Sequence, residues 1–108
     1  TMSQEINRML LELERSMRSI NREVINPEIK ELTIDGLRPL IRLIAQARAR
    51  YLRALFELGD KNSGHTPDDR QLEELGRLRR AYEEMAHAAK ALETAIQRGY
   101  LDVRPSMR

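Results

Sequence analysis

Apolar residues recur along most of this chain at the three- and four-residue spacing of an amphipathic α-helix. The clearest pattern spans residues 3–25, where Ser3 is a suitable N-cap and Asn26-Pro27 is a natural end. Six apolar side chains within it alternate spacings of four and three residues, the heptad pattern of helices that pack along a seam. They are Ile6, Leu10, Leu13, Met17, Ile20 and Val24.

A second helix is predicted over residues 36–58, with Asp35 as its N-cap and Gly59 at its end. Between the two helices, residues 27–35 are expected to form a short helical turn, with Ile29, Leu32 and Ile34 tucked onto the end of a bundle. The apolar seam of the second helix is widened by Leu40 and Ala47. The seam itself consists of Leu37, Ile41, Ile44, Arg48, Tyr51, Leu55 and Leu58.

A third helix is predicted over residues 67–98, since Thr66 is a good N-cap, Pro67 suits the first position and Gly99 suits the C′ position. Its predicted seam is Leu75, Leu78, Tyr82, Met85, Ala89, Leu92 and Ile96. At about 48 Å it would exceed its neighbours, at about 33–35 Å each. The excess would leave an apolar stripe uncovered, so we expect a homodimer or a higher oligomer. Residues 99–108 lack a helical pattern and are expected to be extended.

Composition supports helices packed on helices. The chain has 108 residues, which is one domain by size, and only 4% aromatic residues, so its core must be built from Leu, Ile, Met and Ala. Cysteine is absent, which excludes disulfides and thiolate chemistry. We therefore predict a single all-α domain over residues 1–108, a three-helix antiparallel bundle in up-down-up order with a long third helix that drives self-association.

Charge is unevenly distributed. The formal net charge is +2, but residues 37–58 hold five arginines and one acid, Glu57. Such a face can be a solvated surface, follow a phosphate backbone, lie on anionic lipid or dock an acidic partner. No aromatic residues interleave with the arginines to stack on bases, which disfavours nucleic acid. The residues that we consider for binding a partner or an anion are Arg38, Arg42, Arg48 and Arg53.

Arg48 is the most specific of these, because the helical wheel places it among leucines and isoleucines. A charge there needs a carboxylate, an anion or a route to the edge of the apolar face. Glu74, on the apolar side of the third helix, is the predicted protein partner. The alternative is an anion-binding pocket around Arg48, which would suit a small enzyme or an anion-binding protein.

Other chemistry finds little support in the sequence. Glu84 and His87 have the Glu-x-x-His spacing of di-iron bundles, but the wheel turns both away from the core. The loop from Asp60 resembles a calcium loop, yet His65 and Gln71 stand where glycine and glutamate are needed. No serine has a histidine at helical spacing. We therefore expect no cofactor, no metal and no catalytic residue.

The resulting prediction is a small cytoplasmic, non-enzymatic interaction or assembly protein, homo-oligomeric, which docks an acidic partner through its arginine-rich helix. A nucleic-acid-binding protein is the first alternative. A small enzyme or anion-binding protein with its site around Arg48 is the second. No segment is apolar enough for a membrane span, and membrane binding is not expected.

Overall fold

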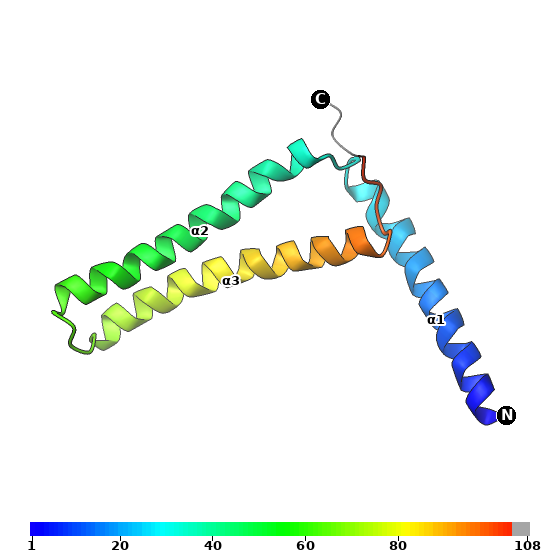
Figure 1. Cartoon of the computed structure of the whole chain (residues 1–108), viewed down its shortest axis with the longest axis horizontal. Helices are drawn as coiled ribbons and strands as arrows, with labels where there is room; N and C mark the ends of the chain where they lie inside the picture. Colours follow the sequence, from blue (N-terminus) through cyan, green and yellow to red (C-terminus); the bar gives the residue numbers. More distant parts are fainter. Residues whose placement is uncertain (105–108) are drawn as a thin grey trace. The chain divides into compact units, whose positions relative to one another are not determined.

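The computed structural model describes residues 1–104, and within this range the chain is all-helical apart from its connections (Figure 1). Three α-helices follow one another: α1 (Met2–Ile25), α2 (Ile34–Lys61) and α3 (Asp69–Gln97). A short 3-10 helix, η1 (Asn26–Glu28), carries Pro27 directly after α1. The predicted all-α class and the three helices are confirmed.

Helix α1 begins earlier than predicted. Its N-cap is Thr1, whose hydroxyl accepts a hydrogen bond from the Gln4 N–H at 3.3 Å, while the Gln4 side chain returns to the Thr1 nitrogen. This reciprocal capping box places the helix start two residues before Ser3, the predicted N-cap, which lies inside the first turn. The predicted end at Ile25 is confirmed, because Pro27 shortens the next turn to the 3-10 form.

Helix α2 continues past the predicted end at Gly59 to Lys61. The backbone leaves the helix at Ser63 and Gly64, whose φ angles are 52° and 80°. The Gly64 N–H donates to the Gly59 carbonyl at 3.1 Å, which closes the final turn. Gly64 is therefore the terminating glycine, since left-handed backbone is where glycine carries no steric cost.

Helix α3 is capped by Asp68 rather than by Thr66. The Gln71 N–H donates to Asp68 Oδ1 at 2.8 Å, and the Asp68 N–H donates to Gln71 Oε1 at 3.0 Å. Its other end follows the prediction: Gly99 has φ 74°, and the Tyr100 N–H bonds to the Ala95 carbonyl at 2.9 Å, a Schellman ending.

The helix lengths overturn one argument from the sequence. Helix α3 has 29 residues and α2 has 28, so the third helix is not the outlier that the pattern suggested. The reason is that α2 gains residues at both ends, while α3 begins two residues later than predicted because Asp68 caps it and ends one residue earlier. Self-association therefore cannot rest on an overhanging third helix.

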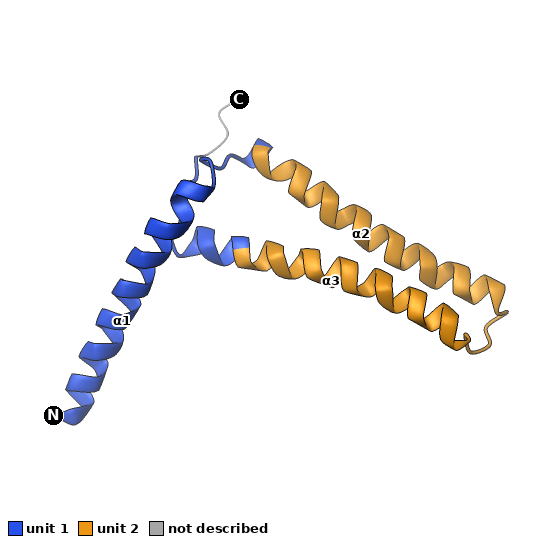
Figure 2. Cartoon of the chain, turned by 180° about the vertical axis from the view of Figure 1, so that it is seen from behind, with its two compact units in different colours: residues 1–35, 92–108 blue, residues 36–91 orange. Residues whose placement is uncertain are grey.

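The chain divides into two compact units, coloured separately in Figure 2. Unit 1 comprises residues 1–35 and 92–108, and its core is a small cluster at the end of α3. Tyr100 and Leu101 are buried there beside Ala95. Partly buried residues surround them: Ile25, Ile29, Leu32, Leu92 and Ile96.

Residues 29–33 are not helical, which corrects the predicted turn, although Ile29 and Leu32 do pack on the core cluster. Leu32 forms an isolated parallel bridge with Val103: the Leu32 N–H donates to the Asp102 carbonyl at 3.1 Å, and the Arg104 N–H donates to the Leu32 carbonyl at 2.7 Å. Ile34 instead opens α2 and is 53% exposed. Residues 99–101 form the turn and bends that follow α3, and Val103 makes the bridge; the extended tail over residues 99–108 stays a prediction, and residues 105–108 lie outside the described range.

Unit 2, residues 36–91, is a helical hairpin in which α2 and α3 pack against each other (Figure 2). Residues near the end of α2, such as Glu57, share a groove with Glu74 near the start of α3, while Ala47 faces Met85. On α3 the predicted seam is the less exposed side of the helix. On α2 the seam is rotated: Ala47 is buried, whereas Ile41 is 63% exposed.

The predicted up-down-up bundle of three helices concerns how unit 1 and unit 2 are arranged, and it stays a prediction. The same holds for the prediction of a single domain.

Candidate functional site

Arg48 of α2 is held by Tyr82 of α3. Its Nε and Nη2 donate to the Tyr82 hydroxyl oxygen at 3.1 and 2.7 Å, and its guanidinium carbon lies 5.1 Å from the centre of the Tyr82 ring. Tyr51 stacks on the same ring, with centroids 6.4 Å apart and planes inclined by 25°. The methylenes of Arg48 can thus cover the apolar side of α2 while its charge reaches an exposed oxygen.

The predicted partner, Glu74, is engaged elsewhere. Arg77 donates to both carboxylate oxygens of Glu74, from Nε at 3.0 Å and from Nη2 at 2.6 Å. This pair lies within one helix at a separation of three residues, a spacing that brings side chains together on a helix surface. The prediction that Arg48 pairs with Glu74 is therefore wrong, because a nearer arginine occupies that carboxylate.

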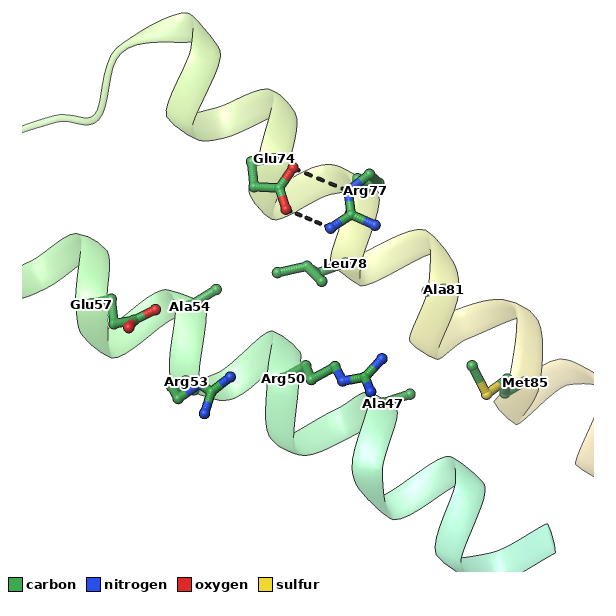
Figure 3. Close-up of a pocket in the computed structure, with 10 residues that line it drawn as sticks. All are labelled: Ala47, Arg50, Arg53, Ala54, Glu57, Glu74, Arg77, Leu78, Ala81 and Met85. Carbon is green, nitrogen blue, oxygen red and sulfur yellow. Dashed lines mark hydrogen bonds and ion pairs between the residues drawn. The ribbon is translucent and has the colours of Figure 1, made fainter.

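A groove of about 390 Å³ lies between α2 and α3 in unit 2 (Figure 3). Its apolar lining is made of small or flexible side chains. The alanines among them let the two helices approach closely. Charged residues stand along it from both helices: Arg50, Arg53 and Glu57 from α2, and Glu74 and Arg77 from α3. The remaining lining residues are Ala47, Ala54, Leu78, Ala81 and Met85.

The charges of this groove are only partly compensated. The Arg77 guanidinium hydrogen-bonds to Glu74 and lowers the pKa of that carboxyl, and the same bond raises the pKa of Arg77. Arg50 and Arg53 have no hydrogen bond or ion pair among residues 1–104, and Figure 3 shows both guanidinium groups at the groove without a partner. Two arginine forks are therefore available for carboxylate or phosphate.

The structure separates the four arginines considered from the sequence. Arg53 lines the groove, and Arg48 lies on Tyr82. Arg38 and Arg42 are exposed residues of α2 that do not line this groove. Arg50 and Arg77 were missed as candidates. Arg50 is three residues before Arg53, a local signal for a shared face, whereas the contribution of Arg77 depends on how α3 packs on α2.

The lining of the groove contains two carboxylates and no histidine. Glu74, one of its two carboxylates, has a lowered pKa, the opposite of what a general acid near neutral pH needs. Across the described residues no cluster of three or more His, Asp or Glu side chains could hold a metal ion. Within the same range, no helix has the length and apolar character to cross a bilayer. The guanidinium groups of Arg50 and Arg53 along the groove are suited to bind an anionic group.

A polar clasp closes unit 1. The Arg22 guanidinium donates to the Gly99 carbonyl at 3.0 Å and pairs with the Asp102 carboxylate. Asn26 accepts the Asp102 N–H at 2.9 Å. Arg22, with a smaller contribution from Asn26, lowers the pKa of Asp102. Sequence reasoning missed this clasp because its partners are more than 70 residues apart.

Within unit 1, most of the apolar seam of α1 is left uncovered. None of the 24 residues of α1 is buried, and its last turns alone, from Asn21 to Ile25, include partly buried side chains. The exposed fractions of the six seam residues range from 45% for Met17 to 62% for Val24. Unit 1 therefore supplies no cover for most of a 24-residue amphipathic helix.

Comparison with known proteins identifies no family for this chain. No family model, no curated protein and no solved structure matches it.

Proposed function

We propose that this protein is a non-enzymatic interaction or assembly protein that associates with copies of itself through α1. The carrying observation is the exposed heptad seam of α1, in which Leu10 and Leu13 are 55% and 53% exposed. A contiguous apolar stripe of this kind marks an interaction surface in soluble proteins. The heptad spacing specifies a helix as the complementary surface.

Self-association is supported by the uncovered seam of α1 and not by the length of α3. Most of the stability of a helix in a protein comes from packing of its amphipathic face, so the 24-residue α1 gains stability when its seam is covered. The up-down-up bundle predicted from the sequence would cover it within one chain. Association between chains would cover it with further copies of α1, and this is the arrangement that we propose.

Sedimentation equilibrium of the full chain tests the proposal. We expect a mass above 12.6 kDa at micromolar concentration. The variant Leu10→Glu should shift the chain to monomer, because it places a charge in the seam. Its matched control is Leu11→Glu, since Leu11 is equally exposed at 55% but lies off the seam. A monomeric wild type, or equal effects of the two variants, would contradict the proposal.

We further propose that the groove of unit 2 docks an acidic protein segment. Arg50 and Arg53 support this role, because two forks three residues apart suit carboxylates spaced along an extended or helical peptide. Arg48 does not contribute, since Tyr82 already satisfies it.

Binding of a labelled oligoglutamate peptide, followed by fluorescence anisotropy, tests this second role. Replacing Arg50 and Arg53 together by Gln should weaken binding about threefold to tenfold at low salt, given the modest strength of exposed ion pairs. Arg42→Gln is the control, because Arg42 lies on α2 outside the groove. Equal losses of peptide affinity in the double variant and in Arg42→Gln would show that the groove is not the binding site. Tighter binding of an oligonucleotide, with a steep salt dependence, would favour the nucleic-acid alternative.

A further inference from the structure

We infer that α1 helices from three or four copies of the chain, rather than two, pack together in one bundle. The inference rests on the proposed function, because it takes the α1 seam as the surface of self-association. It goes further by specifying the partner: at least two additional copies of α1 on each helix. Three features of α1 carry it, namely the residue types in the seam, the residues flanking the seam and the positions of the charges.

The first feature is the distribution of side-chain shapes in the seam. In the heptad, Leu10, Met17 and Val24 occupy a positions, while Ile6, Leu13 and Ile20 occupy d positions. Two-stranded coiled coils favour β-branched residues at a and leucine at d, and leucine at a with isoleucine at d favours three or four strands. Two of the three a residues here are unbranched at Cβ, and two of the three d residues are isoleucine.

The second feature is the width of the apolar face. Two-stranded coiled coils flank the seam with charged e and g residues that pair between helices. In α1 the e positions are Asn7, Glu14 and Asn21, and the g positions are Met2, Met9, Ser16 and Glu23. Met2 and Met9 extend the seam sideways and are 75% and 70% exposed. A stripe wider than a and d alone is the pattern of a helix that packs against more than one neighbour.

The third feature is where the charges are placed. All four arginines of α1 lie at b or f positions, away from the seam, so none can pair with a glutamate across a two-stranded interface. At two of the three e positions, Glu14 and Asn21, the polar groups have partners within the helix. Glu14 lies 3.5 Å from Arg18, and the Asn21 amide donates to the Met17 carbonyl at 2.8 Å. These flanks can therefore approach a second neighbouring helix.

Sedimentation equilibrium of the full chain from about 5 to 500 μM distinguishes the outcomes. We expect the data to fit three or four times the chain mass of 12.6 kDa. The fourfold variant Ile6→Leu, Leu10→Ile, Met17→Ile, Ile20→Leu exchanges the shapes of the a and d positions. It should shift the assembly toward two chains with the helix content of the wild type by circular dichroism.

A second pair of variants keeps the test sharp if the fourfold variant loses helix. Met9→Lys places a charge at a g position, which lies at the rim of a two-helix interface but inside a wider bundle, so it should lower association at least tenfold. Leu11→Lys, at a b position, should leave association unchanged. A wild type that is dimeric would overturn this inference alone. A wild type that is monomeric would overturn the proposed function with it, and equal effects of the two lysine variants would also contradict the inference.

Discussion

The clasp of unit 1 and the hairpin of unit 2 are held together in different ways. In unit 1, segments more than 70 residues apart in the sequence meet through the polar contacts of Arg22 and Asn26. The same unit contains an apolar cluster in which Leu101 is only 4% exposed. In unit 2, two helices joined by a short loop meet over small residues, and Ala47 is the one buried side chain among residues 36–91. Side-chain packing should therefore matter most in unit 1, and helix termination and local pairing should matter most in unit 2.

The largest effect is expected from shortening a side chain in the unit 1 cluster. Leu101→Ala should lower the free energy of unfolding by about 2–4 kcal/mol, because it leaves a cavity among buried neighbours. Leu78→Ala, at a partly exposed position of the hairpin, should cost about 1 kcal/mol. Urea unfolding of both variants measures the difference. Equal losses would show that the two units depend on side-chain packing to the same degree.

The hairpin can be tested at its two glycines near the end of α2. Gly64→Ala should destabilise the fold by about 1–2 kcal/mol, because the φ of 80° at Gly64 is unfavourable for alanine. No atom lies within 4 Å of an added Cβ, so the backbone angle is the whole cause. Gly59→Ala should instead stabilise by about 0.5–1 kcal/mol, since Gly59 lies within the helix in open space. Thermal unfolding measures both changes. The opposite signs would be lost if α2 ended at Gly59.

The contact between Arg48 and Tyr82 should contribute less. Tyr82→Phe removes the hydroxyl that accepts two hydrogen bonds and should cost about 0.5–1 kcal/mol while keeping the stacked ring. Tyr51→Phe is the matched control, because the Tyr51 hydroxyl makes no hydrogen bond within residues 1–104. Urea unfolding measures both variants. An equal loss of unfolding free energy in Tyr51→Phe and Tyr82→Phe would show that the hydrogen bonds to the Tyr82 hydroxyl are not the cause.

The smallest effect concerns pH. Arg22 lowers the pKa of Asp102 in the folded chain, so the stability from this pair is present above the ordinary Asp pKa of 3.8. It is lost as the pH falls through the lower pKa of the folded state. Glu74 contributes in the same direction through Arg77. The urea midpoint should therefore fall less between pH 5 and pH 2.5 in Asp102→Asn than in the wild type. An identical fall would show that the clasp has no part in it.

The helices could be predicted from the sequence because apolar periodicity is a local property. The α3 seam and its Schellman ending at Gly99 were predicted correctly for that reason. Helix starts were less predictable, since Thr1 and Asp68 each compete with a nearby residue that is also a good cap. The choice depends on which residue has a glutamine three positions later to complete the capping box.

The candidate site was harder to predict, since it depends on long-range packing. Ala47 is buried and Ala54 lines the groove, and Arg48 beside Ala47 reaches the hydroxyl of Tyr82 on α3. No local sequence pattern predicts that an arginine will bond to a tyrosine hydroxyl on another helix. The ion pair of Glu74 and Arg77 could have been predicted from the sequence, because opposite charges three residues apart on a helix commonly pair. The partners of Asp102 lie too far away in the chain for any such rule.

Hydrogen–deuterium exchange of α1 at several protein concentrations tests the central claim most directly. If other copies of the chain cover the seam, amide protection over residues 6–24 should rise with concentration and should collapse in Leu10→Glu but not in Leu11→Glu. Protection near Tyr100 and Leu101 should stay constant, because its partners belong to the same chain. Protection of α1 that is independent of concentration would contradict the account and assign the seam to its own chain.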